Sequence, residues 1–568
     1  MNVIHAIDGL MPHLVMAPVL LPMLAAAAML LLGDTRRPLK AVLNVLASAA
    51  GVLIAIALVV QVQRGGAAQS VGVYLPGNWP VPYGIVLVAD RLSAMMLLLT
   101  SLLGLAGVLY ASARWHKAGV HFHPLYQLQL MGLAGAFLTA DVFNLFVFFE
   151  IMLTASYGLL LHGSGWPRVR AGLHYIAINL MASSLLLIGV AILYGVTGTL
   201  NMADMALMVP RIADDDRGLL HAGAAILAIA FLVKAAAWPF NAWLPAAYAS
   251  AVAPVAALFA VMTKLGVYAI LRLWTLLFPQ DAGISALFGG PVLMGLGMLT
   301  LGFGVVGVIA VQHLGRMAAF CAIVSSGTLL AAIGFGQPAV TGGALYYAMG
   351  STLAVGAFFL LVELIDRARD VEEQPVYVGQ AGDDTAFAFP VDLAPTRDVN
   401  LDDDQQALIG RAIPAAMAFL GLAFIVCALT LAGLPPMAGF VGKVVMLSAL
   451  LNPAGFGAQA SISLAAWLLL ALLVTGGLLT TIAMSRAGVR CFWAPQGRPV
   501  PRLRIIETLP IGLLLLLIGL LVWQADAVLR YANATARGLH DPRHYIGSVM
   551  AARPLPSPHT TGEAGLRR

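Results

Sequence analysis

The chain contains continuous apolar stretches of about 20 residues along almost its whole length, which is the length a helix needs to cross roughly 30 Å of hydrocarbon. Of its 568 residues, 60% are hydrophobic and 10% are charged, whereas about 25% are charged in an ordinary soluble domain. Helix is the expected state, because lipid-exposed backbone must satisfy its own hydrogen bonds and alternating barrel strands do not give such continuous runs. The sequence therefore predicts an all-α, polytopic membrane protein.

Counting the apolar runs predicts about fourteen transmembrane helices. The residues before the first run include no Lys or Arg, unlike the basic start of a signal peptide, so we expect this run to remain as the first helix. The runs occupy residues 14–32, 41–61, 92–112, 124–140, 141–162, 172–196, 220–237, 253–277, 290–311, 317–335, 342–365, 413–432 with an extension to 452, 462–484 and 508–529.

Basic residues gather in the loops after odd-numbered runs, which by the positive-inside rule predicts that these loops are cytoplasmic. Both termini are then expected on the periplasmic side of a bacterial inner membrane, although the C-terminal tail also carries arginines, which argues against this orientation. Loops after even-numbered runs hold only Arg64, Arg211, Arg217 and Arg272. The odd loops hold Arg36, Arg37, Lys40, Arg114, Lys117, Arg168, Arg170, Arg316, Arg367, Arg369, Arg397, Arg411, Arg486, Arg490, Arg498, Arg502 and Arg504.

Several classes of partner and site are disfavoured. The net charge of +5 is scattered, so no nucleic-acid partner is indicated. The three cysteines are far apart, which argues against a disulfide framework or an iron–sulfur site. Three histidines between residues 116 and 123 have no Cys or carboxylate beside them, so a metal site there is not favoured. Residues 366–408 contain eleven Asp or Glu and predict a solvated acidic loop, with docking of a partner protein as the alternative.

Four charged residues lie inside apolar runs, where charge is expensive. Lys234, Lys264 and Lys443 are the lysines in such positions, and Glu150 is the acidic residue nearest the middle of a run. Each central charge costs about 2.5–3.5 kcal/mol on insertion scales. A desolvated lysine can release its proton near neutrality, whereas arginine stays protonated. These lysines therefore predict a proton relay.

Less specific interpretations of the same residues stay open. A lysine near a helix end can extend its ammonium group to the lipid headgroups, which could apply to Lys234 and Lys443 but hardly to Lys264. A structural ion pair of Glu150 with one lysine would account for two of the four charges. It leaves the other two unexplained.

Helix-breaking prolines lie beside two of the lysines. Lys234 precedes Pro239 and Pro245, and Lys443 follows Pro435 and Pro436. Proline removes a backbone donor and clashes with the preceding turn, so we expect two helices to be interrupted at these positions. Interrupted helices at corresponding places in two halves are typical of inverted-repeat transporters.

With these features in place, the chain resembles the D-type subunits of the multisubunit Mrp/Pha-type monovalent cation/proton antiporters. The superfamily also includes the antiporter-like proton-pumping subunits of respiratory complex I. The resemblance covers roughly residues 80–490 and is carried by DVFNLFVFFEIMLTASYGLLLHG (141–163), LYGVTGTLNMAD (193–204), KAAAWPFNAWLPAAYASAVAPVAALFAVMTKLGVY (234–268) and LAGLPPMAGFVGK (431–443).

The resemblance implies a fourteen-helix fold with two inverted five-helix repeats and interruptions in helices 7 and 12. It implies helices 1–3 in residues 1–123, a first repeat in 124–277, a second in 290–484, and helix 14 with a polar tail in 508–568. It further implies that Glu150 pairs with Lys234 on a polar axis that continues through Lys264 and Lys443. The implied partners are antiporter subunits of the A, B, C, E, F and G types, and the implied ions are H⁺ with Na⁺ or K⁺. No cofactor is implied.

Two departures from the superfamily pattern are informative. Complex I relatives usually carry a histidine-rich HTWLPDAH after the first break, where this chain has NAWLPAAY (241–248), which favours the Mrp/Pha branch. Helix 11 of relatives often carries His and Lys, but residues 348–352 contain nothing titratable. A proton moving from Lys264 to Lys443 would need water, for which the candidate holders are Ser325, Ser326, Tyr346, Tyr347, Ser351 and Thr352.

The predicted function is that of the proton-translocating subunit of a cation/proton antiporter serving pH homeostasis, a transporter rather than an enzyme. One alternative is a proton-pumping subunit of a complex I-like oxidoreductase or membrane-bound hydrogenase. A second is a scaffold subunit that carries no ions and uses the buried lysines for pairing.

Overall fold

The computed structural model describes residues 13–33, 35–64, 70–115, 119–163, 165–373, 415–453, 461–492 and 503–555. Within them, 12 helices are long and apolar enough to cross a membrane. These are α3 (Arg37–Arg64), α4 (Arg91–Ala111), α6 (Val142–Leu160), α7 (Trp166–Thr197), α9 (Arg217–Lys234), α11 (Ala253–Leu277), α12 (Gly290–Ala310), α13 (Leu314–Gly334), α14 (Pro338–Glu373), α15 (Ala415–Ala432), α17 (Leu464–Phe492) and α18 (Ile505–Trp523).

Shorter elements complete the bundle. They are α2 (Ala17–Leu31), α5 (Phe122–Leu138), α8 (Met202–Met208), α10 (Trp243–Ser250), α16 (Ala438–Leu451), α19 (Ala525–His540), α20 (Arg543–Met550) and a hairpin of β1 (Gly72–Tyr74) and β2 (Leu87–Ala89). Counting the shorter apolar helix α2 and the 17-residue α5 with these twelve gives fourteen crossings among the described residues, with α9–α10 and α15–α16 each forming one interrupted crossing. The polytopic helical fold and both interruptions expected from the sequence are therefore confirmed.

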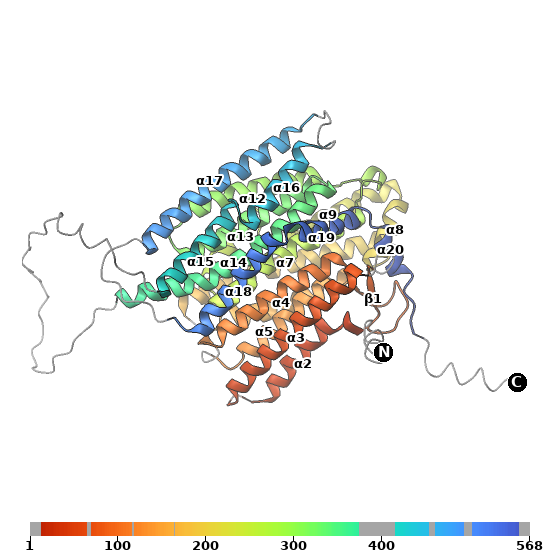
Figure 1. Ribbon diagram of the computed structural model, residues 1–568. Helices are drawn as coiled ribbons and strands as arrows, with labels where there is room; N and C mark the ends of the chain where they lie inside the picture. The colour runs from red at the N-terminus through yellow and green to blue at the C-terminus, as the bar shows by residue number, and fades with distance from the viewer. Residues whose placement is uncertain are drawn as a thin grey trace, which may run out of the picture.

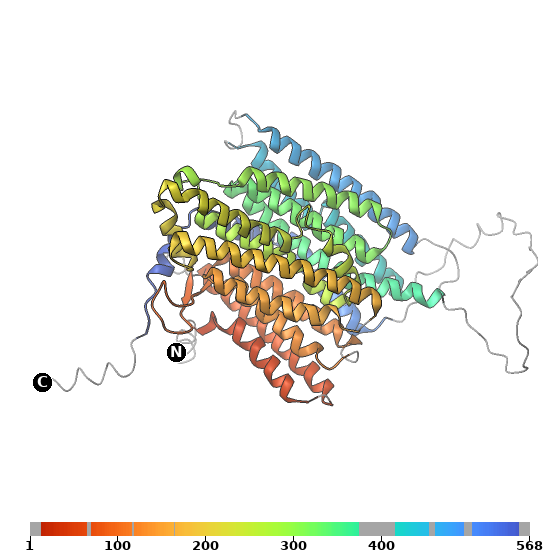
Figure 2. The same cartoon turned by 180° about the vertical axis from the view of Figure 1, so that it is seen from behind.

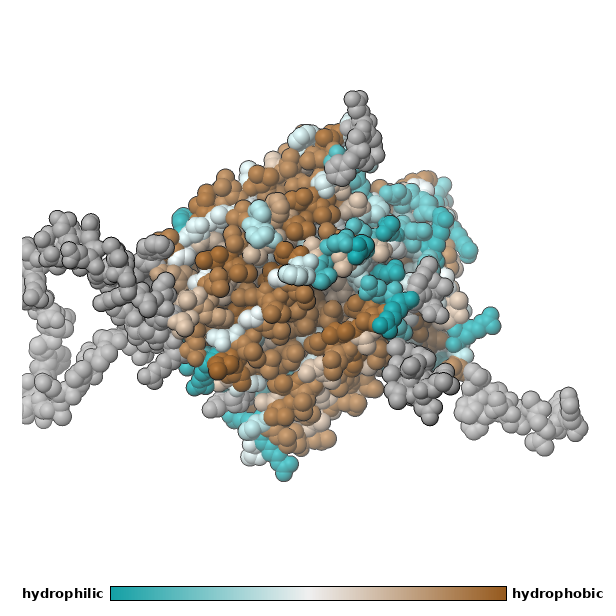
Figure 3. All heavy atoms as spheres, viewed as in Figure 1, coloured by the Kyte–Doolittle hydropathy of each residue, from teal (hydrophilic) through white to brown (hydrophobic). Residues whose placement is uncertain are grey.

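The long helices lie side by side along one direction, with the N-terminal helices at one edge of the bundle and α12 and α17 at the other (Figures 1 and 2). A broad hydrophobic band covers the middle of the molecule, and hydrophilic residues gather at the helix ends (Figure 3). This is the surface expected of a protein whose middle faces lipid.

The two ends of the bundle differ in what they carry. The first and last described residues meet near the hairpin, where Asn78 Nδ2 donates to Leu555 O at 3.0 Å and His13 lies 3.4 Å from the Tyr74 hydroxyl. We call this the terminal end. The opposite end is rich in arginine, and there Arg168 Nε donates to Ser250 O at 2.7 Å. We call it the arginine-rich end.

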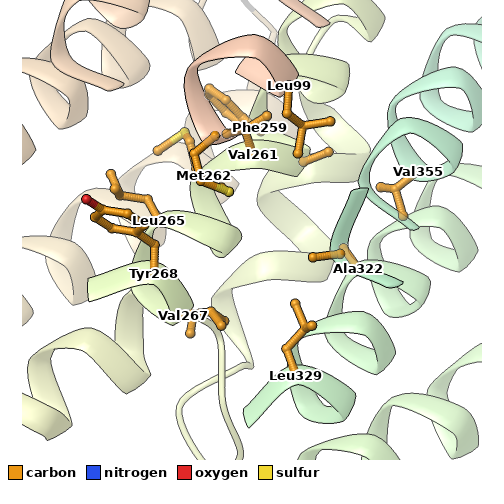
Figure 4. Close-up of a cluster of buried hydrophobic side chains, with 14 of the residues drawn as sticks. Leu99, Phe259, Val261, Met262, Leu265, Val267, Tyr268, Ala322, Leu329 and Val355 are labelled. Atoms are coloured by element: carbon orange, nitrogen blue, oxygen red, sulfur yellow. The ribbon is translucent and has the colours of Figure 1, made fainter. Parts of the chain in front are cut away.

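Helix α11 lies at the centre, and every residue in its 18-residue membrane-spanning stretch is buried inside the protein. Leu99 of α4, Ala322 and Leu329 of α13 and Val355 of α14 surround it, together with its own large side chains (Figure 4). Helix α11 carries the charged residues Lys264 and Arg272, which hydrocarbon does not solvate, so other helices must cover it. Lys264 therefore sits in the most protected helix of the chain.

Three expectations about loops and tails are corrected. Helix α14 continues to Glu373, so the acidic segment does not begin at 366; Glu363 and Arg367 support this extra helix as an i,i+4 pair 3.8 Å apart. The rest of that segment, 374–408, lies outside the described residues. The run expected at 508–529 ends at Trp523, and the expected polar tail forms α19 and α20 instead.

The position of Lys40 is also corrected. The sequence places it in a loop, whereas it lies in the first turn of α3 and is only 1% exposed. Nearby on the same helix, Asn44 and Ser48 contact Gln127 of α5 at 2.7 and 3.1 Å. The start of α3, which the sequence assigned to a loop, is therefore buried next to a polar cluster between α3 and α5.

We predict that the terminal end faces the periplasm, because most arginines of the loops between the membrane-spanning helices lie at the opposite end. A cysteine introduced at exposed Asp215, near the start of α9, should react with an impermeant maleimide from outside intact cells. A cysteine introduced at exposed Arg316, at the start of α13, should react only in everted vesicles. Native cysteines contribute little background because Cys321, Cys427 and Cys491 are all buried. The reverse labelling pattern would contradict this orientation.

Candidate functional site

The first interrupted crossing ends its first half at Lys234. Ala236 takes a left-handed conformation with φ 53°, which turns the chain out of the helix. The break is stabilised by side chains, since Trp238 N donates to Thr300 Oγ1 of α12 at 2.8 Å. Pro245 does not form a second break as expected; it lies in the first turn of α10, where a missing N–H costs no helical hydrogen bond.

Lys234 is buried between three helices. The residue is only 4% exposed, and its Nζ lies 3.4 Å from Ser183 Oγ of α7. The ammonium group also lies 4.8 Å from the centroid of the Phe149 ring on α6. Lys234 is the last residue of α9, where the negative end of the helix dipole favours a cation.

Glu150 follows Phe149 on α6 and is half-buried. Its Oε1 atom is buried and has no hydrogen-bond partner. Among the described ion pairs within 4.0 Å, none joins Glu150 to Lys234, so the direct pair implied by the family resemblance is not formed in this conformation. The Glu150 carboxylate nevertheless acts electrostatically on Lys234. The two charges are therefore neighbours without contact.

Lys264 lies in the middle of α11 and is 3% exposed. Its Nζ is 3.5 Å from Ser326 Oγ of α13, which is the polar contact of this ammonium group. A cavity of about 30 Å³ lies beside it, which exceeds the roughly 10–15 Å³ that one water molecule needs. Lys264 is thus deeply buried but has space for water next to it.

Lys443 lies on α16, just beyond the second interruption, and is 8% exposed. Its Nζ donates to Ala432 O, the last carbonyl group of α15, at 2.8 Å. Gly433 continues the chain with φ 77°, and a methyl group at this glycine would lie 2.5 Å from Lys443 Nζ. The interruption therefore gives the buried lysine a helix C-terminus as its partner.

Hydroxyl groups of α13 and α14 cluster beside Lys264. Ser326 contacts Lys264, and the adjacent Ser325 lies 2.8 Å from Ser351 of α14, hydroxyl to hydroxyl. The Tyr347 phenol approaches Ser325. Four of the six water-holding residues proposed from the sequence are therefore brought together.

The other two candidates point elsewhere. Tyr346 OH donates to Leu521 O of α18 at 2.9 Å, and Thr352 Oγ1 donates to Ala348 O of its own helix at 2.6 Å. Sequence reasoning missed Cys321 on α13, a buried thiol that lies close to Lys443 and to Tyr347. Its spacing of four residues from Ser325, on one helix face, was the available signal.

A buried ion pair on α11 was also missed. Arg272 Nη2 lies 2.7 Å from Asp90 Oδ1, and the two side chains are 5% and 14% exposed. Arg272 follows Lys264 by eight residues, which places both on the same face of the helix. Arg272 counts among the loop cations in the sequence-based prediction although the predicted run 253–277 includes it, and the structure places it inside α11.

A second polar network occupies the arginine-rich end. Arg367 Nη1 donates to Glu507 Oε1 at 2.9 Å, and Trp115 Nε1 donates to Glu363 Oε2 at 3.0 Å. These contacts tie α14 to α18 and to the end of α4.

The described part of the chain contains no group of three His, Cys, Asp or Glu side chains placed to hold a metal ion. Of the clustered histidines, His116 lies outside the described residues, and His123 Nδ1 lies 2.8 Å from Asn44 Nδ2. The chemistry available at the site is therefore that of ammonium, carboxylate and hydroxyl groups, which exchange and conduct protons.

An antiporter-like bundle with two interrupted, lysine-bearing crossings is the class of protein that this fold and site define, and the comparisons agree. A family model described as NADH:quinone oxidoreductase/Mrp antiporter, TM matches residues 139–379. The chain is 48% identical over 541 residues, 95% of its length and 98% of the relative's, to the D subunit of a probable K(+)/H(+) antiporter from Rhizobium meliloti. It is 31% identical over 547 residues to the D subunit of an Na(+)/H(+) antiporter from Bacillus subtilis, covering 95% of this chain and all of that one.

Solved structures give the same picture. The chain superposes on a chain of the Mrp complex from Dietzia sp. with a TM-score of 0.77 at 25% identity, covering 95% of this chain and 99% of that chain. It superposes on a chain of respiratory complex I from Thermus thermophilus with a TM-score of 0.70 at 22% identity, covering 95% and 100%. The chain belongs to the family of D-type antiporter subunits, whose named members are parts of transporters rather than enzymes.

We predict that Gly433→Ala destabilises the protein. A residue other than glycine pays about 1–2 kcal/mol in the left-handed region, and the added methyl group would also collide with Lys443. Thermal unfolding of the purified protein should shift down by a few degrees. Gly519→Ala on α18 is the matched control, since nothing lies within 4 Å of its added methyl group. Equal melting temperatures for the two variants would contradict the close packing at this interruption.

Proposed function

We propose that the chain is the proton-translocating subunit of a multisubunit monovalent-cation/proton antiporter in a bacterial inner membrane, with Glu150, Lys234, Lys264 and Lys443 as its proton relay. The observation that carries this proposal is the burial of three lysines, each below 9% exposed, in helices at membrane depth. Membership of the family of D-type antiporter subunits supports the same function. The expected partners remain the A, B, C, E, F and G subunit types.

The energetics support a relay over simple pairing. A buried ammonium group is costly in hydrocarbon and is normally compensated by a nearby carboxylate. Here, Lys264 has a serine hydroxyl and Lys443 has a backbone carbonyl as partners, and neither forms an ion pair with a described residue. Such groups can exist in neutral or protonated form according to the charges around them, which a structural ion pair cannot do.

Charge coupling would drive the relay. When the Glu150 carboxylate moves toward Lys234, it stabilises the protonated amine; when it moves away, the proton is released toward Lys264. Coulomb interactions in a low-dielectric interior are strong enough to link such titrations. The Oε1 atom of Glu150 is buried without a hydrogen-bond partner among the described residues. This supports a carboxylate group that moves between partners and is not held by one of them.

The path from Lys264 to Lys443 would run through the hydroxyl groups of α13 and α14. Ser326, Ser325 and Ser351 supply consecutive hydrogen-bonding groups in a region where α14 has no acidic or basic side chain. Tyr347 and Cys321 extend the series toward Lys443. Two repeats, 124–277 and 290–484, would each contribute one interrupted crossing to this path.

Two rival functions predict different behaviour. A component of a redox-driven pump would not exchange cations without electron transfer. A scaffold would need the lysines for assembly but not for transport. The known relatives favour the antiporter, and both experiments below separate it from the rivals.

We predict that Lys264→Arg abolishes antiport while preserving assembly. Arginine keeps the positive charge but does not release its proton, so a relay should slow by at least about 10²-fold. The measurement is cation-induced collapse of a pH gradient in everted vesicles, with co-purification of partner subunits as the assembly readout. Lys40→Arg is the matched control, because Lys40 is also a buried lysine but lies on α3, away from the path. An active Lys264→Arg complex would overturn the relay, and loss of assembly in Lys264→Gln would favour the scaffold.

We also predict that K⁺ is the preferred cation. The relative named for K⁺ is 48% identical to this chain, whereas the relatives named for Na⁺ are 31% identical. In vesicles with a pH gradient imposed by dilution, and no redox substrate, K⁺ should act at a lower half-maximal concentration than Na⁺ or Li⁺. A stronger response to Na⁺ would contradict the cation assignment, and no response to any cation would favour the redox-driven pump.

A further inference from the structure

We propose that His540 and Thr341 form the passage through which protons exchange between Lys264 and the terminal end of the bundle. This inference rests on the proposed function of Lys264 in proton transfer. It concerns a pair of residues that the four relay positions do not include. The pair joins α19, which follows the last crossing, to the start of α14.

Two cavities in series connect Lys264 with the terminal end. The inner cavity, about 30 Å³, is lined by Lys264 on α11 and by Thr341 on α14. The outer cavity, about 40 Å³, lies between the end of α11 and the start of α12 and is lined by His540. Leu271 and Ile333 line both cavities and so form the wall between them. Each cavity is large enough for water.

One hydrogen bond joins the residues that line the two cavities. His540 Nε2 lies 3.0 Å from Thr341 Oγ1. The Thr341 hydroxyl also lies within reach of Gln337 O, to which it donates at 3.1 Å. The imidazole–hydroxyl contact therefore provides a polar connection beside the apolar wall of Leu271 and Ile333.

The position of His540 follows from the way α19 packs. Its apolar face buries Ala532, Ala536 and Leu539 against the bundle, while Arg537 on the other face is exposed. Tyr531 OH donates to Arg91 O at the start of α4 at 2.8 Å, which fixes α19 across the helix ends. Asn533 packs directly against Gly342 of α14, a contact that only glycine permits. His540 is the last residue of α19 and ends beside Thr341.

The pair can pass a proton without forming or breaking any other bond. When the imidazole is protonated, Nε2–H donates to Thr341 Oγ1, and the hydroxyl donates to Gln337 O. When the imidazole is neutral with its proton on Nδ1, the Thr341 hydroxyl donates to Nε2 instead. Transfer starts from the neutral tautomer with its proton on Nε2, which takes up a proton at Nδ1 from the outer cavity and becomes imidazolium. The Nε2 proton then passes to Thr341 Oγ1 while the hydroxyl proton leaves to water in the inner cavity, and this water passes a proton to neutral Lys264 Nζ. The ring is left neutral with its proton on Nδ1, and rotation of the ring or proton exchange with water restores the first tautomer.

Burial lowers the pKa of His540 below its usual range, which keeps the imidazole neutral at neutral pH and ready to accept a proton. The charged groups on the adjoining segments are engaged with each other, since Arg543 lies 3.1 Å from Asp281 and 3.9 Å from Asp541. On α19 itself, Arg537 points to solvent. Among the described residues, α11, α12, α13 and α14 present no titratable side chain to the outer cavity.

The test is antiport by the whole complex in vesicles, with the pH varied independently on each side. His540→Gln keeps a hydrogen-bonding side chain but cannot carry the proton, so we expect the rate to fall at least about tenfold. The rate should also lose its dependence on pH below about 6.5, where a histidine of lowered pKa titrates, at the face that carries the termini, while its dependence on pH at the other face is retained. His544→Gln is the matched control, because His544 is exposed on the neighbouring α20.

Threonine variants separate a positioning role from mere packing. Thr341→Val has nearly the same shape but no hydroxyl, and should reproduce the loss seen in His540→Gln. Thr341→Ser restores the hydroxyl and should restore the rate. A normal rate and pH profile in His540→Gln, alongside an inactive Lys264→Gln complex, would overturn this passage while leaving the relay intact. If Lys264→Gln is itself active, the proposed function fails first.

Discussion

The arrangement depends on how three ammonium groups are accommodated where water is scarce. Lys443 uses the end of a broken helix, since it binds the final carbonyl group of α15. Lys234 is the last residue of the other broken helix, α9, and its Nζ contacts the Ser183 hydroxyl. A helix C-terminus offers unsatisfied carbonyl oxygens and a negative dipole end, which stabilise a cation without adding a full negative charge. An ammonium held by carbonyl or hydroxyl groups is easier to deprotonate than one held by a carboxylate. The interruptions thus make the lysines tolerable in the membrane while leaving their protons exchangeable.

Most of the bundle could be predicted from the sequence because the membrane enforces simple patterns. Apolar runs of spanning length and prolines beside Lys234 and Lys443 specify crossings and interruptions directly. What failed depends on contacts between segments distant in sequence. Arg272 looked like a loop residue because its burial requires Asp90 from another segment of the chain. The helical tail was missed because α19 has small and polar residues whose amphipathic pattern is meaningful only against the bundle it covers.

Helix α13 connects the two halves of the site. One of its faces presents Ser326 to Lys264, and the preceding residue, Ser325, turns toward Ser351 on α14. Farther along, Cys321 interacts with Lys443. A single helix thereby contacts the surroundings of two relay lysines that lie on α11 and α16. This explains how a site can be continuous although helix α14 contributes no acidic or basic residue at its centre.

The packing around the lysines limits the kind of motion that transport can use. A methyl group at Gly266 of α11 would lie 2.7 Å from Ala235 N and Phe231 O, so α11 touches the backbone of α9 directly beside Lys234. At the second interruption, a methyl group at Gly442 would lie 2.8 Å from Tyr347 Cα. Backbones in such contact cannot slide or separate without breaking a close-packed interface. Side-chain rotation of Glu150 and of the long lysine chains, together with the entry and exit of water, requires no such separation. The structure therefore favours proton movement by local rearrangement over sliding of α9 against α11 or of α16 against α14.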